Sequence, residues 1–323
     1  CNATQLAILM RYYKYARPVV AYTPPYTSGA YVPMRKIDGN YDWDNMPLTY
    51  PWNGYGDERD AAVAKLMADL GALLRSYYGV GSTYASTDPD VFDLFGYQYE
   101  KPIARYSFTD DEWNEKLMHS LDERHPVLYH ASGHAFILDG YNEDGYYHAN
   151  LGWGGSSNGF FELNALNFND TTNTSAGIAY VGVCPIDDTD YEISDIVATV
   201  GDLSFSEAQN ALTYAAGTGE ELTFLKDVSI ADRLYVGVGS LNKLCVNLNG
   251  HTLKLFDIQV SSGELTLKDS PGGGGKIEFS TLAEYPLQNY GTMLIENVAI
   301  SGGNDNIHWL FYNEGNAIIR RCT

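Results

Sequence analysis

Apolar residues at helical spacing predict two helices in the first quarter of the chain. The first set follows Cys1 directly, in "NATQLAILMRYYKY", and consists of Leu6, Leu9, Met10 and Tyr13. Because these positions recur at intervals of three and four residues, we expect an amphipathic helix that begins at the cysteine itself. The stretch "ERDAAVAKLMADLGALLRSYYG" repeats the pattern, and we expect a helix there that runs to Tyr77 and stops at Gly79.

The pattern changes from helices to strands before the middle of the chain. A third helix is expected to begin at Thr109, since Glu112 completes the form of a capping box. From "HPVLYHA" onward, short apolar or alternating runs are separated by Gly, Asn and Asp, as in "HAFILDGYN", "GYYHANLGW" and "GFFELNAL". Helices followed by an antiparallel sheet are typical of an α+β domain. We expect this domain to cover residues 1–186, with an acidic linker at 187–196.

Residues 197–323 have a different, repetitive pattern. After one expected helix in "FSEAQNALTYAAG", the segments "SSGELTLKD", "NYGTMLIEN" and "NEGNAIIRR" each place a glycine two residues before alternating apolar positions. These glycines, Gly263, Gly291 and Gly315, lie 28 and then 24 residues apart. Drifting repeats without an internal helix predict the coils of a parallel β-helix, and a β-sandwich is the alternative. The wording "VNLNGHTLKL" and "GTMLIENVAISGG" resembles pectate-lyase-like β-helix domains, which favours a right-handed β-helix, incomplete at its C-terminal end.

Composition narrows the classes of partner. A length of 323 residues suits about two domains. The formal net charge of −21 argues against binding to nucleic acid, whose phosphates would be repelled. No apolar run is long enough for a membrane span. The four cysteines are too widely and irregularly spaced for a disulfide framework or a CxxC metal site, and no cofactor is expected. Because the chain opens on Cys1 and closes within a strand pattern, we expect it to be a fragment of a longer protein.

The segment "GHAFILDGYNEDGYYHANLGWGG" at 133–155 carries the candidate chemistry. Cys1 lies at the predicted N-terminus of a helix, where unpaired N–H groups stabilise a thiolate. His134 follows the small, flexible Gly133 and could serve as the base. Asn150 has a side-chain amide that could hold the imidazole in one tautomer, and Trp153 could cover that hydrogen bond. Together they predict a cysteine nucleophile activated by a histidine.

Several separated segments resemble the streptopain family of cysteine peptidases. They are "CNATQLAILMRYY", "KLMADLGALLRSYYG", "PVLYHASGHAFILDGY" and "YYHANLGWGGSSNGFFELNALN", in this order over residues 1–186. The resemblance implies a papain-like fold, endopeptidase activity on polypeptides through an acyl-enzyme, and an upstream propeptide removed from a secreted bacterial zymogen. It also implies Cys1, His134 and Asn150 as the catalytic residues, with Trp153 and Gly133 in support. The backbone N–H of Cys1 would then contribute to the oxyanion hole.

The chain departs from the family pattern at two places. Leu151 stands where relatives usually carry the first tryptophan of Asn-Trp-Gly-Trp-Gly-Gly. The loop before Gly133 is also shorter than the Gly-rich segment of relatives. Both changes bear on substrate preference and efficiency rather than on the cysteine and the histidine.

Three other interpretations compete with the peptidase. His130 and His134 are four residues apart, which on a helix could bind zinc, but they lie in a strand pattern without HExxH. Cys1 could instead be an N-terminal nucleophile with its own amine as base, although a helix starting at Cys1 argues against this. Finally, the β-helix could bind a glycan or a host-surface ligand in a secreted or cell-surface adhesion protein whose peptidase domain is weak or inactive. Leu151 is the residue that favours this view.

Overall fold

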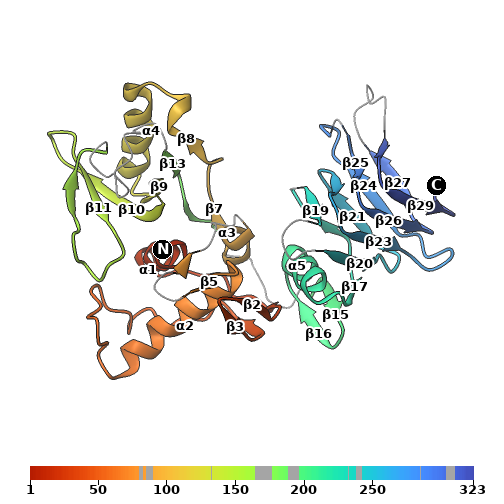
Figure 1. Ribbon diagram of the computed structural model, residues 1–323, viewed down its shortest axis with the longest axis horizontal. Coiled ribbons are helices and arrows are strands. Elements are labelled where there is room, and N and C mark those ends of the chain that lie inside the picture. The colour runs from red at the N-terminus through yellow and green to blue at the C-terminus, as the bar shows by residue number, and fades with distance from the viewer. Residues whose placement is uncertain are drawn as a thin grey trace. The chain divides into compact units, whose positions relative to one another are not determined.

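The computed structural model describes residues 1–79, 83–84, 90–131, 133–163, 177–187, 196–231, 233–237, 242–283, 285–302 and 310–323. The chain divides into two compact units (Figure 1). The first comprises residues 1–18, 27–32 and 39–190, and the second comprises 19–26, 33–38 and 191–323. Most of the linker predicted at 187–196 lies outside the described residues, so the expected boundary at 186 stays a prediction.

A six-stranded antiparallel sheet forms the centre of the first unit. Its strand order is β12-β11-β10-β9-β13-β8. The strands are β8 (Ile103–Ala104), β9 (Val127–Ala131), β10 (His134–Tyr141), β11 (Tyr147–Asn150), β12 (Gly159–Phe161) and β13 (Gly177–Tyr180). The helices are α1 (Asn2–Tyr13), α2 (Glu58–Leu73), α3 (Asp90–Phe95) and α4 (Asp110–Asp122), with a short 3-10 helix η1 (Arg105–Ser107). Helices α1 and α4 both contact β10 and lie on either side of the sheet in Figure 1.

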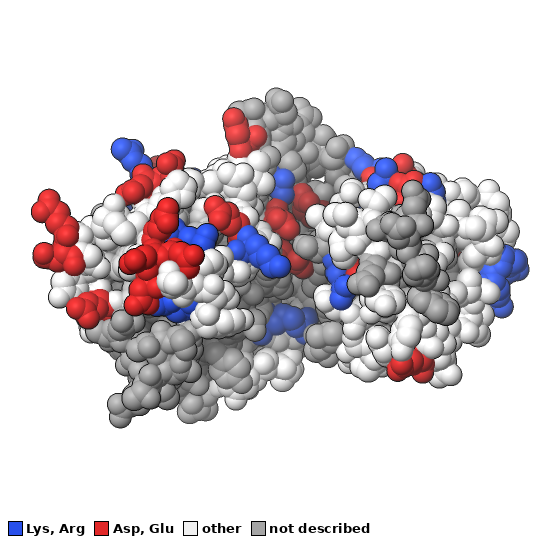
Figure 2. Space-filling view, turned by 90° about the horizontal axis from the view of Figure 1, so that it is seen from above, with Lys and Arg blue, Asp and Glu red and all other residues white. Residues whose placement is uncertain are grey.

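The predicted helix starts in the first unit are confirmed. Cys1 is the N-cap of α1, and the apolar face buries Leu6, Leu9 and Met10. Thr109 caps α4 in a reciprocal capping box with Glu112. Helix α4 then buries Trp113 and Leu117 against sheet residues that include Phe136 and Tyr147. The first turn of α4 is acidic. On the face of the first unit that Figure 2 shows, Asp and Glu side chains predominate over Lys and Arg.

The predicted end of the second helix was wrong. Helix α2 stops at Leu73, and Tyr77 belongs to a short strand, β5 (Tyr77–Tyr78), paired with β6 (Thr83–Tyr84). Arg75 adopts φ 48°, and the Ser76 and Arg75 N–H groups bond the carbonyls of Gly71 and Ala72 at 2.9 and 3.1 Å. This is a Schellman ending, for which glycine is usual but not required. The apolar spacing in the sequence continues to Tyr77, but the backbone hydrogen bonds end the helix at Leu73.

The second unit is a three-sided parallel β-helix of about four coils, which excludes the β-sandwich. One side is formed by β17, β20, β23, β26 and β29, a second by β18, β21, β24 and β27, and a third by β19, β22, β25 and β28. The bounds of the first side are Glu221–Phe224, Lys243–Asn247, Glu264–Lys268, Thr292–Glu296 and Asn316–Arg320. Those of the second are Val228–Ser229, Thr252–Leu255, Lys276–Phe279 and Ala299–Gly302. Those of the third are Leu234–Val236, Ile258–Val260, Leu287–Asn289 and Phe311–Asn313.

The repeated glycines mark one corner of this β-helix. Gly263, Gly291 and Gly315 each directly precede the first-side strand of their coil. A Cβ on Gly291 would collide with the carbonyl oxygen of Gly263, and one on Gly315 with that of Gly291. Successive coils therefore approach each other here more closely than any side chain would allow. A segment of similar form, "LNGHTLKL" at 248–255, begins about half a period before "SSGELTLKD" and leads into β21 on the second side.

The first coil is closed by a helix and two short antiparallel strand pairs. Helix α5 (Ala208–Thr218) follows the pair β15 (Ala198–Val200) and β16 (Leu203–Phe205). The pair β1 (Ala21–Thr23) and β4 (Arg35–Ile37) belongs to the same unit and contacts α5. The remaining two-stranded sheets are β2 (Tyr26–Ser28) with β3 (Ala30–Val32), and β7 (Tyr97–Gln98) with β14 (Cys184–Pro185). No helix in the described part of the chain is long and apolar enough to cross a membrane.

Candidate active site

Cys1 lies half-buried at the N-terminal end of α1. Its carbonyl accepts the first helical hydrogen bond from the Gln5 N–H at 2.8 Å, and its thiol lies 3.3 Å from the side-chain oxygen of Asn2. The unpaired N–H groups of the first turn carry partial positive charge. Such partial positive charge at a helix N-terminus stabilises a thiolate, the reactive form of cysteine.

His134 begins β10, directly after Gly133, whose φ of 76° is readily available only to glycine. The ring nitrogen Nε2 lies 2.9 Å from the carbonyl oxygen of Leu151. A carbonyl oxygen can only accept a hydrogen bond, so Nε2 carries the proton. In the neutral ring Nδ1 is then the unprotonated nitrogen, which can accept a proton as a base. A backbone carbonyl thus selects the tautomer.

The surroundings of His134 favour the neutral imidazole. Burial lowers the pKa of His134, and the hydrogen bond to Leu151 opposes this in part. Helix α1, whose N-cap is Cys1, contacts β10, the strand that His134 begins. A neutral histidine can accept the proton of a thiol held at a helix N-terminus.

Trp153 covers one side of the histidine. The register of β10 with β11 pairs Ile137 with Asn150, and its continuation brings Trp153 opposite His134. The two rings stack with centroids 5.0 Å apart and planes 29° apart. The indole remains 48% exposed, so it shields the imidazole on one face and meets solvent on the other.

Asn150 shapes the turn that carries Leu151 and Trp153. Its side-chain oxygen accepts a hydrogen bond from the Gly152 N–H at 3.2 Å, as in an Asx turn. Asn158 accepts another from the Leu151 N–H at 3.0 Å. These two amides fix the loop whose Leu151 carbonyl meets His134. The Leu151 side chain, which replaces the tryptophan of the family pattern, is buried in the core together with Trp113 and Leu117 of α4.

Gln5 joins the cysteine helix to the histidine strand, a role that no sequence pattern indicated. The residue is 1% exposed. Its amide nitrogen donates to the carbonyls of Tyr129 on β9 and Phe136 on β10, and its oxygen lies 2.9 Å from Nε2 of His130. All the polar atoms of this buried side chain are therefore paired. The only available signal was a glutamine one turn after Cys1, beside the apolar face of the helix.

His130 takes part in this buried network rather than in a zinc site. The Gln5 oxygen can only accept, so Nε2 of His130 donates to it. Burial lowers the pKa of His130 to about 4. Within the described residues, no group of three or more His, Cys, Asp and Glu side chains is arranged to hold a metal ion.

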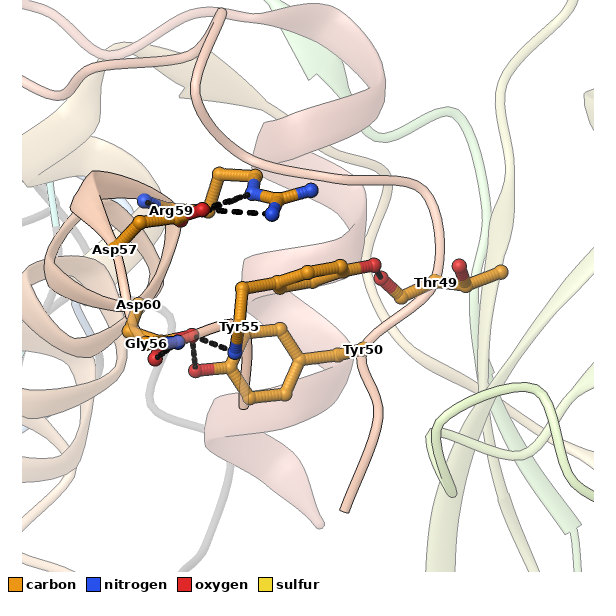
Figure 3. A network of polar contacts seen from close by, with 7 residues as sticks. All are labelled: Thr49, Tyr50, Tyr55, Gly56, Asp57, Arg59 and Asp60. Carbon is orange, nitrogen blue, oxygen red and sulfur yellow. Dashed lines mark hydrogen bonds and ion pairs between the residues drawn. The ribbon is translucent and has the colours of Figure 1, made fainter. Parts of the chain in front are cut away.

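The loop of residues 48–56 is held by the first turn of α2 (Figure 3). The Asp60 carboxylate, in the first turn of α2, accepts hydrogen bonds from the Tyr50 hydroxyl and from the N–H groups of Tyr55 and Gly56, at 2.8, 2.8 and 2.7 Å. A Cβ on Gly154 would lie 2.7 Å from the carbonyl oxygen of Tyr50. The loop backbone therefore touches the turn that follows Trp153.

Comparison with known proteins agrees with this arrangement. The model of the Peptidase C10 family matches residues 1–161, which include Cys1, His134, Asn150 and Trp153. This N-terminal part of the chain is therefore similar to the Peptidase C10 family.

The chain is also similar to several individual proteins. Streptopain of Streptococcus pyogenes is 33% identical over 185 residues, covering 52% of this chain and 46% of streptopain. The thiol protease/hemagglutinin PrtT of Porphyromonas gingivalis is 28% identical over 274 residues, covering 74% of this chain and 30% of PrtT. Among solved structures, active wild-type interpain A of Prevotella intermedia aligns at a TM-score of 0.46 and 27% identity, over 56% of this chain and 81% of interpain A. The chain spans less than half the length of these two curated relatives.

Proposed function

We propose that the chain is a cysteine endopeptidase that cleaves polypeptides through Cys1 and His134. The observation that carries the proposal is the hydrogen bond from Nε2 of His134 to the Leu151 carbonyl. It leaves Nδ1 unprotonated, and His134 begins the strand β10 that contacts α1, the helix with Cys1 at its N-terminus. The match of residues 1–161 to the Peptidase C10 family model supports the same reaction class.

The reaction begins with transfer of the Cys1 thiol proton to Nδ1 of His134. The thiolate sulfur attacks the carbonyl carbon of the scissile peptide, and the backbone N–H of Cys1 stabilises the negative oxygen that forms. His134 then gives its proton to the leaving amine as the C–N bond breaks, which leaves a thioester on Cys1. Water, deprotonated by His134, hydrolyses the thioester and regenerates the thiol.

The supporting residues act on the position of His134. Asn150 holds the turn that presents the Leu151 carbonyl, and Trp153 excludes water from one face of the ring. We therefore assign Asn150 a positioning role through the backbone. Gly133 permits the tight entry into β10.

Hydrolysis of casein under reducing conditions tests the proposal. Cys1→Ala and His134→Ala should each abolish turnover, whereas the matched control Cys245→Ala, on the β-helix, should retain it. Burial followed by the nearby Glu221 raises the pKa of Cys245, so this thiol is a poor nucleophile. A parent protein that folds but neither cleaves casein nor reacts with a thiol-directed peptide probe would contradict the proposal.

Similarity to its relatives also suggests where the protein is located and how it matures. We infer a secreted or cell-surface bacterial enzyme that is made as a zymogen with an upstream propeptide. The β-helix would direct the peptidase to its target.

Adhesion is the second candidate function. The similarity to the thiol protease/hemagglutinin PrtT covers 74% of this chain, more than the predicted peptidase domain contains. On this view the β-helix binds a glycan or host-surface ligand whether or not the peptidase is active. Agglutination of erythrocytes by the Cys1→Ala chain would support it, and failure of that chain to bind cells or a glycan array would exclude it.

A further inference from the structure

The loop of residues 48–56 exposes two large apolar side chains beside the candidate active site. Trp52 is 100% exposed and Leu48 is 90% exposed. Tyr50, which lies between them, is partly buried. Exposed apolar groups that gather beside a reactive centre are typical of a binding surface.

Hydrogen bonds to one carboxylate keep this loop in a fixed shape. Asp60 accepts from Tyr50, Tyr55 and Gly56, as Figure 3 shows. The Arg59 guanidinium lies 3.6 Å from the centroid of the Tyr55 ring and is also paired with Asp57. A loop ordered in this way presents its side chains without a large entropy cost on binding.

The loop borders His134 through the Trp153 turn. The Tyr50 carbonyl approaches Gly154 so closely that a Cβ there would lie 2.7 Å away, and the neighbouring Trp153 stacks on His134. Trp52 is two residues from Tyr50, a span of at most about 7 Å. That is roughly the length of two extended substrate residues.

The chemistry identifies which half of a substrate would lie here. His134 protonates the leaving amine, so the residues that follow the scissile bond leave from the histidine side of the site. We propose that the loop of residues 48–56, held by Asp60, binds the leaving-group half of the substrate and selects apolar side chains there. The proposal rests on the peptidase function proposed above. Asp60 acts as a positioning residue, and Trp52 and Leu48 determine specificity.

Peptides that differ only after the scissile bond test this proposal in the full chain. One internally quenched peptide carries Phe at the second and third positions after the cleaved bond, and its partner carries Ser there. A third substrate ends in a fluorogenic amine directly after the cleaved bond and has no leaving-group half. We expect the parent to prefer the Phe peptide, and Trp52→Ala to lower kcat/KM for it roughly tenfold, mainly through KM.

Two further variants separate specificity from folding. Asp60→Asn should also lower kcat/KM for the Phe peptide, because the amide nitrogen that replaces one carboxylate oxygen cannot accept a hydrogen bond from the loop. The control Tyr106→Ala removes another exposed aromatic of the first unit, 78% exposed, and should change nothing. Neither Trp52→Ala nor Asp60→Asn should alter kcat for the fluorogenic amine.

The outcomes distinguish this proposal from the peptidase function itself. A parent that cleaves all three substrates equally, or a Trp52→Ala variant with unchanged kcat/KM, overturns the specificity proposal alone. An equal loss on all three substrates also overturns it, since the loop would then support the catalytic residues rather than the substrate. A parent that cleaves none of them overturns the proposed function and this inference together.

Discussion

Individual polar side chains fix the candidate site, and several of them are buried. Gln5 ties α1 to β9 and β10, so it holds the cysteine helix against the strand that begins with His134. The Leu151 carbonyl, rather than the side chain of residue 151, contacts the imidazole. The substitution of leucine for the family's tryptophan therefore leaves the tautomer of His134 unchanged.

Replacement of Gln5 by Leu should weaken both folding and turnover. It would remove the buried hydrogen bonds of Gln5 to two backbone carbonyls and to His130, which costs on the order of 2–3 kcal/mol in the free energy of unfolding. Because Cys1 is four residues away on the same helix, kcat for a short fluorogenic substrate should also fall. Urea unfolding and steady-state kinetics measure the two effects. Tyr12→Phe on the exposed side of α1 is the control. An equal effect there would refute the role of Gln5 in holding α1 against β9 and β10.

The buried His130 should make the first unit sensitive to acid. Its folded pKa of about 4 lies below the ordinary value of 6.5, so between these values the unfolded chain binds a proton that the folded chain does not. The free energy of unfolding should consequently fall as pH drops from 6.5 to 4, by on the order of 2–3 kcal/mol.

A His130→Gln variant isolates this effect. Its amide keeps a donor for Gln5 but does not titrate in this range. Urea unfolding at pH 7 and pH 4.5 should show a smaller loss in the variant than in the parent. Equal losses would mean that other groups control the acid sensitivity.

At the scale of elements, the shape of the β-helix depends on its stacked glycines. Gly291 has an ordinary φ, so replacing it with alanine would cost stability through collision with the Gly263 carbonyl alone. Gly272 lies in a turn with φ 76° and has no atom within 4 Å of the position that an alanine Cβ would take. Replacing it with alanine would therefore cost stability only through the strained backbone conformation.

Gly291→Ala should therefore destabilise the second unit more than Gly272→Ala. The strain at Gly272 costs about 1 kcal/mol, whereas forcing two backbones apart costs several. Thermal unfolding followed by far-UV circular dichroism compares the two variants. Equal melting temperatures would show that the corner can open at no cost.

At the scale of the whole molecule, the second unit includes residues from the N-terminal part of the chain. The Val20 and Tyr22 N–H groups donate to the side chains of Ser206 and Asn210 at 3.0 and 3.1 Å. The Tyr22 ring lies 5.5 Å from the ring of Phe205 and 6.5 Å from that of Tyr214, centroid to centroid. The first coil is therefore completed by residues that are distant in sequence.

Tyr22→Ala should destabilise the second unit, although residue 22 lies within the range predicted for the peptidase domain. Loss of the aromatic contacts should cost on the order of 3 kcal/mol and lower the unfolding transition of the β-helix. Tyr31→Ala is the control, since Tyr31 is 68% exposed. If both variants melt like the parent, residues 19–26 are not part of the folded unit.

The sequence alone determined the features that local patterns encode. Helical spacing and the capping box predicted α1 and α4, alternation predicted the strands around His134, and the spaced glycines predicted the β-helix. These patterns are local because propensity, capping and pleat alternation act over a few residues. The candidate residues Cys1, His134, Asn150 and Trp153 came from the same kind of short segment.

Only the tertiary structure decided what depends on contacts between distant segments. The role of Gln5 follows from carbonyls on two strands more than a hundred positions away. The end of α2 followed from the Schellman hydrogen bonds at Arg75, and the place of Tyr22 from a helix near residue 210. The Leu151 carbonyl has no side-chain signature at all, because every residue carries the same backbone oxygen. Such roles arise when folding places a backbone or side-chain group next to one particular residue that is distant in sequence, and no local sequence pattern encodes that contact.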